Sequence, residues 1–187
     1  MSLEEIRTKI DRVDRELLKL LSERAELVHE VGEIKRKEGL EIFAPDREEK
    51  LMRKLIELNK KNKGRLPEKS LRAIFREIIS AALALEQDLR IAYLGPAGSW
   101  THQVAISRFG NSVLYLAEAS TEDVFERVEV QEADYAVLPI EHSTEGAVHH
   151  TLDHLIESPL QIYSQILWRT ETVLMSNGPR ESVDYIY

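Results

Sequence analysis

The sequence predicts two differently built units in one chain, a three-helix unit followed by an α/β unit with a parallel sheet. Up to about residue 88, apolar residues recur every three or four positions, which is the period of an amphipathic helix. After residue 90, short apolar runs alternate with helical segments, which is typical of a parallel sheet. The charge distribution changes at the same place: residues 1–88 hold 20 of the 25 Lys and Arg, and no lysine follows Lys69. We therefore expect domains at 1–88 and 90–187.

The composition narrows the function classes. The net charge of −8 argues against a nucleic-acid-binding protein, because neutralising phosphates requires a basic surface. No run of about 18 apolar residues is present, so we expect no membrane span, and the first residues do not resemble a secretion signal. Cysteine is absent, which excludes disulfides and cysteine-ligated metals and fits a cytoplasmic protein.

The first unit is expected to contain one long helix and two shorter ones. The long helix runs over 4–37, is roughly 50 Å long, and ends at Gly39. Pro45 begins the second helix, which reaches about Asn62, and the third spans 67–86. The long helix leaves an apolar stripe that two short helices cannot cover. We therefore predict a helical homodimer.

Several charged residues of this unit lie where they could form a binding site. Arg24 and Lys35 are 11 positions apart and thus share one helix face, so both side chains could reach one small anion. Arg7 is about 25 Å from Arg24 along the helix and could only reach a ligand held by an antiparallel partner. Glu86 continues an apolar face, and burial would raise the pKa of its carboxyl group. The alternative is that these are ordinary solvated side chains.

Four motifs follow one another in this unit: Ile6-Arg7-x-x-Ile10-Asp11, Leu20-Leu21-x-x-Arg24, Val31-Gly32-x-x-Lys35 and Pro45-Asp46-Arg47-Glu48. This ordered set resembles the all-helical class of chorismate mutases. The resemblance covers residues 3–88. It implies an intertwined helical dimer with two sites, each of which uses an arginine from the other subunit.

The resemblance also implies roles for individual residues. Arg24, Arg47 and the partner subunit's Arg7 would bind the two carboxylates of chorismate. Lys35 and Glu86 would donate hydrogen bonds to the ether oxygen whose bond to the ring breaks.

Glu48 would accept a hydrogen bond from the ring hydroxyl. The family often has an acidic residue at the position of Ala44 and a serine at that of Ala82, and some members have Gln at that of Glu86. The rearrangement to prephenate requires no nucleophile and no cofactor, so fixed charges around a compact conformer can accelerate it.

The second unit is expected to alternate strands and helices. The predicted strands are 91–94, 113–116 and 133–140, the predicted helices are 100–109, 121–130 and 144–156, and 160–167 and 171–175 are expected to be extended. Two turn motifs follow strands: Gly95-Pro96-x-Gly98-Ser99, and Glu141-His142-Ser143-Thr144-Glu145-Gly146. Each would supply hydroxyls and backbone N–H groups at a helix start, which suits a carboxylate. Plain helix capping is the alternative.

These two motifs resemble prephenate dehydratase, whose catalytic part has two lobes like a periplasmic binding protein. The resemblance spans about 90–187 and implies that Ser99, His142, Ser143 and Thr144 contact prephenate, although the family usually has Asn at position 142. The family's Thr-Arg-Phe motif and its second lobe are not found in this sequence. We therefore expect mutase activity and negligible dehydratase activity.

The leading hypothesis is a chorismate mutase joined to an incomplete dehydratase lobe, acting in phenylalanine biosynthesis without metal or other cofactor. In His149-His150-x-x-x-His154, the two histidines four positions apart share a helix face, but without a third acidic or His ligand motif we favour a solvated face over a metal site. The alternative function is a dimeric ligand-binding sensor module, in which the helices form a stalk and catalyse nothing. Chorismate and prephenate are the expected small-molecule partners, and no nucleic-acid or membrane partner is expected.

Overall fold

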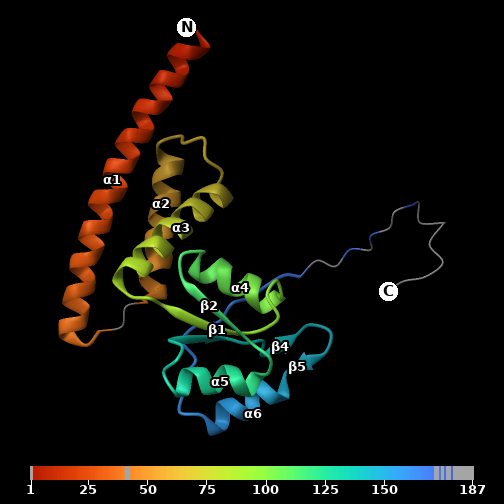
Figure 1. Cartoon of the computed structure of the whole chain (residues 1–187). Coiled ribbons are helices and arrows are strands. Elements are labelled where there is room, and N and C mark those ends of the chain that lie inside the picture. Colours follow the sequence, from red (N-terminus) through yellow and green to blue (C-terminus); the bar gives the residue numbers. More distant parts are fainter. Residues whose placement is uncertain (1, 41–42, 171–172, 174, 176–177, 179–187) are drawn as a thin grey trace.

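The computed structural model describes residues 2–40, 43–170, 173, 175 and 178. A helical part precedes an α/β part, as the sequence predicts (Figure 1). In chain order the elements are α1 (Leu3–Glu38), α2 (Pro45–Lys61), α3 (Glu68–Glu86), β1 (Arg90–Leu94), α4 (Trp100–Phe109), β2 (Leu114–Glu118), α5 (Thr121–Glu129), β3 (Tyr135–Val137), β4 (Glu141–His142), β5 (Gly146–Ala147) and α6 (His149–Glu157).

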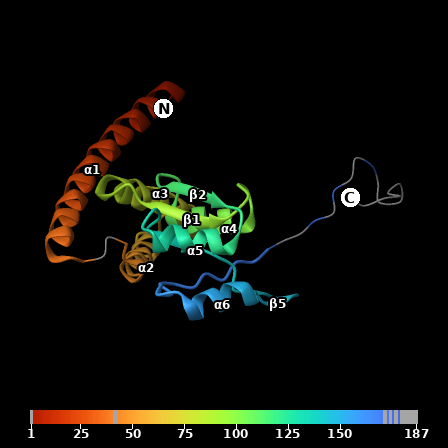
Figure 2. The ribbon, with the colours of Figure 1, turned by 60° about the horizontal axis from the view of Figure 1, so that its bottom comes forward.

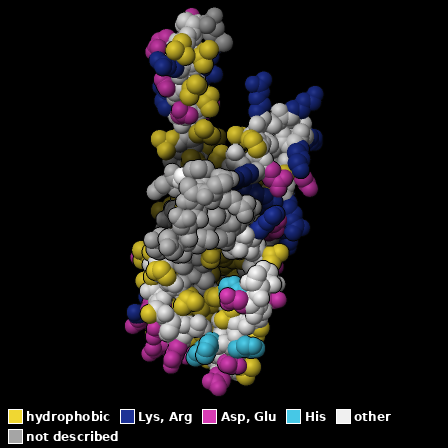
Figure 3. All heavy atoms as spheres, turned by 90° about the vertical axis from the view of Figure 1, so that its right-hand side faces the viewer, with side chains coloured by type: hydrophobic (Ala, Val, Ile, Leu, Met, Phe, Trp, Pro, Cys, Tyr) yellow, Lys and Arg dark blue, Asp and Glu magenta, His cyan; other side chains and the backbone are white. Residues whose placement is uncertain are grey.

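Helix α1 has well-defined ends and a mostly exposed body. Ser2 and Glu5 form a reciprocal capping box at its start, and Gly39 ends it with a positive φ of 66°. Only Gly32 is buried along its 36 residues. The helix extends well beyond α2 and α3, and hydrophobic side chains line its projecting half (Figures 1 and 3). The exposed apolar residues of α1 are Leu3, Ile6, Ile10, Val13, Leu17, Leu18, Leu20, Leu21, Leu27 and Ile34.

The sheet of the second part is parallel, with strand order β2-β1-β3. Successive residues of β1 point to opposite faces. Ile91 packs on the face that carries α4, whereas Ala92 packs with Val124 of α5 on the other face. Figures 1 and 2 show α4 and α5 on either side of the strands. The prediction of a parallel α/β sheet is therefore confirmed.

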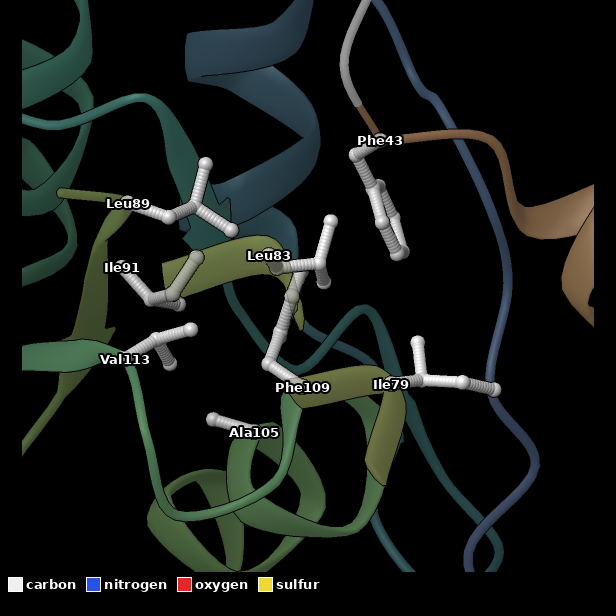
Figure 4. Close-up of a cluster of buried hydrophobic side chains, with 8 residues drawn as sticks. All are labelled: Phe43, Ile79, Leu83, Leu89, Ile91, Ala105, Phe109 and Val113. Atoms are coloured by element: carbon white, nitrogen blue, oxygen red, sulfur yellow. The ribbon is translucent and has the colours of Figure 1, made fainter. Parts of the chain in front are cut away.

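One hydrophobic cluster crosses the predicted boundary between the two parts. It contains Ile79 and Leu83 of α3 together with Ile91 of β1 and Phe109 of α4 (Figure 4). The remaining buried members are Phe43, Leu89, Ala105 and Val113. The change from helical to α/β architecture thus occurs near residue 88 without a break in the core.

The structure corrects two predictions in the second part. The third strand is shorter than 133–140 and comprises only Tyr135–Val137. No helix starts at Thr144, because residues 141–147 form the β4–β5 hairpin, in which Gly146 has a φ of 78°. Such a positive φ at glycine closes a hairpin loop and is incompatible with a continuing helix. Helix α6 consequently begins at His149.

The extended segment predicted at 160–167 has no regular secondary structure, and 171–175 lies largely outside the described residues. Within the part of the chain that the structure describes, no helix is both long and apolar enough to cross a membrane.

Candidate active site between the three helices

Residues of helices α1, α2 and α3 line an open cavity of about 120 Å³. All the polar residues that line it were expected to bind one ligand. They are Arg24, Lys35, Arg47, Glu48 and Glu86. The apolar lining consists of Val28, Val31, Ala44, Leu51, Ile79, Ala82 and Leu83. The tertiary structure thus brings together five of the six residues predicted for this site.

Helical periodicity explains why α1 and α3 each present several lining residues. On α1, Arg24, Val28, Val31 and Lys35 follow one another at spacings of three or four and therefore form one continuous stripe. On α3, the stripe ends at Glu86, in the last turn of the helix. The result is a cavity with apolar walls and charged groups at defined positions.

Glu86 is buried, with 8% of its surface exposed. A Cβ atom at Gly32 would lie 3.0 Å from Glu86 Cγ, so α1 approaches α3 closely at this point. The Oε2 atom of Glu86 is buried and has no hydrogen-bond partner among the described residues. Burial raises the pKa of the Glu86 carboxyl, and nearby Lys35 opposes this as the largest of the cationic influences. The carboxyl group is thus biased toward its protonated, hydrogen-bond-donating form.

The cations of the cavity lie close enough to influence one another. Burial lowers the pKa of Arg24, and repulsion from Arg47 lowers it further. Two guanidinium groups and the Lys35 ammonium group thus face a small, partly apolar space. Such an arrangement favours a ligand with more than one negative charge.

Glu48 has two arginine partners, neither of which the sequence analysis identified. Its Oε2 atom lies 3.3 Å from Arg76 Nη1 and 3.7 Å from Arg108 Nη1. Burial raises the pKa of the Glu48 carboxyl, and Arg108 and Arg76 oppose that change. Arg76 lies three residues before Ile79 on α3, so the helical period could have indicated it. Arg108 lies in the α/β part, and no local pattern indicates its contact.

Arg7 does not line the cavity. It lies near the start of α1, where its Nη1 atom is 3.6 Å from Glu4 Oε2 and its side chain is 63% exposed. Its separation from the other five site residues agrees with the expectation that it cannot reach their ligand within one chain.

The two alanines that depart from the family pattern, Ala44 and Ala82, both line the cavity. Ala44 occupies the N-cap position of α2 and provides no side-chain cap. At these positions a ligand would therefore meet methyl groups, whereas the family often has a carboxylate at the position of Ala44 and a hydroxyl at that of Ala82.

In the α/β part, Ser99 is the N-cap of α4, as the alternative interpretation expected. Its Oγ accepts from the His102 N–H at 3.2 Å and lies 3.1 Å from the Leu94 carbonyl, to which it donates. The hydroxyl of Thr101 also donates to the Leu94 carbonyl. The Ser99 hydroxyl is thus engaged in local bonds at the end of β1.

The second motif of this part lies on an exposed hairpin instead of a helix start. His142 is in β4, and Ser143 and Thr144 are in the turn that follows. The idea that their hydroxyls cap a helix is therefore wrong. His154 stacks on Phe125, with ring centroids 5.3 Å apart. No cluster of three or more potential metal ligands occurs among the described residues.

Comparison with known proteins identifies both parts of the chain. Residues 6–87 match the family model "Chorismate mutase type II", and residues 91–187 match "Prephenate dehydratase". The bifunctional chorismate mutase/prephenate dehydratase of Aquifex aeolicus is 43% identical over 99% of this chain and 52% of its own length. That of Neisseria gonorrhoeae is 40% identical over 97% of this chain and 49% of its own length.

A solved structure of chorismate mutase from Thermus thermophilus is 40% identical, covers 45% of this chain and 92% of its own, and has a TM-score of 0.41. The chain spans about half the length of the curated relatives that it matches. With one family model on each part, in the same order as in these relatives, the chain belongs to the bifunctional chorismate mutase/prephenate dehydratase family.

Proposed function

We propose that this chain catalyses the rearrangement of chorismate to prephenate in the cavity between α1, α2 and α3. The observation that carries the proposal is the set of charged groups around one cavity: Arg24, Lys35 and Arg47 as cations, with a buried Glu86. A dicarboxylate substrate supplies the negative charges that such a cluster favours. A unimolecular rearrangement requires only that the reactive conformer be held and its developing charge stabilised.

Arg24 and Arg47 would hold the carboxylates of chorismate. Lys35 and protonated Glu86 would donate to the ether oxygen, which gains negative charge as its bond to the ring breaks. Fixed donors aimed at such an oxygen commonly contribute about 10²–10³ in rate each. Glu48 would accept from the ring hydroxyl.

The active form would be a homodimer that shares its sites. The exposed apolar stripe of α1 gives a second copy a surface to cover, and residues such as Leu17 and Leu20 are half or more exposed without it. Packing α1 against an antiparallel copy would bring the partner subunit's Arg7 toward the cavity. The third carboxylate-binding cation would thus come from the partner subunit.

Prephenate dehydration, named for the curated relatives, would lead toward phenylpyruvate and phenylalanine in a protein of their length. The 187 residues contain no Thr-Arg-Phe sequence, which the resemblance associates with that step. We expect the purified 187-residue chain to release no detectable phenylpyruvate from prephenate. A cytoplasmic location is part of the same proposal.

The mutase proposal is tested by following the loss of chorismate absorbance after the protein is added. We expect turnover by the wild-type chain and its near-abolition in Arg24→Ala and Lys35→Ala, with the dimer retained in sedimentation. Lys19→Ala, on the exposed surface of the same helix, serves as the matched control and should remain active. Binding of chorismate without turnover would refute the enzyme and favour the sensor module.

A further inference from the structure

Arg108, a residue of the α/β part, reaches the wall of the mutase cavity. It lies in the last turn of α4, and its Nη1 atom is 3.7 Å from Glu48 Oε2. The side chain is only 17% exposed, and its guanidinium group lies 5.0 Å from the centre of the Phe43 ring. Arg108 is not itself among the residues that line the cavity. It contacts the cavity lining through its ion pair with Glu48.

The segment that leads into α2 is also held by contacts with the α/β part. Phe43 is 2% exposed and packs against Phe109 and Tyr135, with ring centroids 4.8 Å and 5.3 Å away. The hydroxyl of Tyr163 donates to the Phe43 carbonyl at 2.7 Å. All three partners belong to the α/β part, whereas Glu48 lies in the first turn of α2, five residues after Phe43. The α/β part thus positions the start of the helix that carries Glu48.

The end of α4 is held firmly against α3. The Ser112 N–H donates to Ser80 Oγ at 3.0 Å, and Asn111 Nδ2 donates to Glu77 at 2.8 Å. The contact is too close for a side chain at Gly110, where a Cβ would lie 2.4 Å from the Ser80 Cβ. Arg108 is therefore presented to Glu48 from a fixed backbone.

We propose that Arg108 is a positioning residue of the mutase site, which acts by holding the Glu48 carboxylate. Arg108 and Arg76 both contact Oε2 of Glu48, so Oε1 would be the oxygen that accepts from a substrate hydroxyl. The helical part alone lacks this contact, and the α/β part completes the site. The inference rests on the proposed mutase function and adds a contribution from outside the helical unit.

The test compares Arg108→Gln and Arg108→Lys with wild type in the full 187-residue chain. We expect kcat/KM for chorismate to fall about tenfold in Arg108→Gln, which corresponds to about 1.4 kcal/mol. Arg108→Lys keeps the charge and should recover part of that loss. Arg127→Gln is the matched control, because Arg127 also lies near a helix end but binds Glu118 and Glu132 within the α/β part. It should have wild-type activity.

A double-mutant cycle with Glu48→Gln separates positioning from general damage. If Arg108 acts through Glu48, Arg108→Gln has no further effect on kcat/KM once Glu48→Gln is present. If the losses of kcat/KM caused by the two substitutions instead multiply in the double variant, the proposal is overturned. So would wild-type kcat/KM in Arg108→Gln.

A second readout does not depend on turnover. The ionisation of Glu48 can be followed by carbon-13 NMR of glutamate-labelled protein, with its signal assigned by loss in Glu48→Gln. The cations that face Glu48 are Arg76 from α3, Lys35 from α1 and Arg108 from α4. Removing Arg108 should move the Glu48 titration to higher pH, and an unmoved titration would overturn the contact. An inactive wild type would refute only the mutase function, whereas an active wild type with an unaffected Arg108→Gln variant would refute only this inference.

Discussion

The sharpest consequence of the site concerns the protonation of Glu86 and its effect on the rate. Burial raises the pKa of the carboxyl, and Lys35, Arg36, Arg47 and Arg24 only partly oppose it. Below this raised pKa the group is a donor, and above it the group is an anion that repels the ether oxygen as it becomes negative. The mutase rate should therefore fall as pH rises through the Glu86 pKa.

The size of the fall follows from the number of donors that are lost. Above the pKa, the protonated fraction decreases tenfold for each pH unit, so the rate should do the same. The decline should level off about 10²–10³-fold below the maximum, because loss of one donor to a developing oxyanion costs about that much. A bound dianion neutralises the surrounding cations, which then oppose the raised pKa of Glu86 less strongly, so this pKa is higher in the complex than in the free enzyme. The decline in kcat, which reports the complex, should therefore lie at higher pH than the decline in kcat/KM, which reports the free enzyme.

The assay is the loss of chorismate absorbance at constant ionic strength across the pH range. Glu86→Gln keeps a donor that does not titrate, so its profile should be flat where the wild-type profile falls. A variant profile that follows the wild-type one would refute the role of Glu86, as would a wild-type rate that rises with pH. The same titration bears on stability. The contribution of Glu86 protonation to the free energy of unfolding is complete below the pKa of a glutamate in the unfolded chain. It is lost as the pH rises through the raised pKa of Glu86 in the folded protein.

Three further experiments test the site and the dimer. Leu20→Glu places a charge on the apolar stripe of α1, where Leu20 is 60% exposed, and should shift sedimentation at micromolar concentration toward the monomer with loss of activity; an active monomer would contradict shared sites. Arg7→Ala and Arg24→Ala should each be nearly inactive. An equal mixture of the two variants that exchanges subunits should regain about a quarter of wild-type activity, because half of the dimers would have one intact site out of two. No recovery of activity would place Arg7 outside the site. Gly32→Ala would place a Cβ 3.0 Å from Glu86 Cγ and should lower kcat about tenfold by displacing the carboxyl, whereas unchanged kcat would mean that Glu86 needs no fixed position.

Local sequence patterns predicted the helical part closely. Pro45 marks the start of α2 and Gly39 follows the end of α1, because each residue has backbone restrictions or freedoms that act within one turn. The common face of Arg24 and Lys35 follows from the helical period alone, and both line the cavity. Local patterns were less reliable at 141–147, where serine and threonine suggested a helix start. The positive φ of Gly146 instead closes a hairpin.

The sequence by itself determined the order of the helices and of the three parallel strands, the family, and which charged residues share a helix face. Each of these depends on residues a few positions apart or on motifs that can be read directly. Only the tertiary structure revealed that Phe43 lies in a core shared with the α/β part and that Arg108 contacts Glu48. Glu48 and Arg108 are separated in sequence by helix α3, strand β1 and three connecting segments, and no local preference relates their positions. Their contact depends on how α4 packs against α3, and that packing is a property of the assembled core.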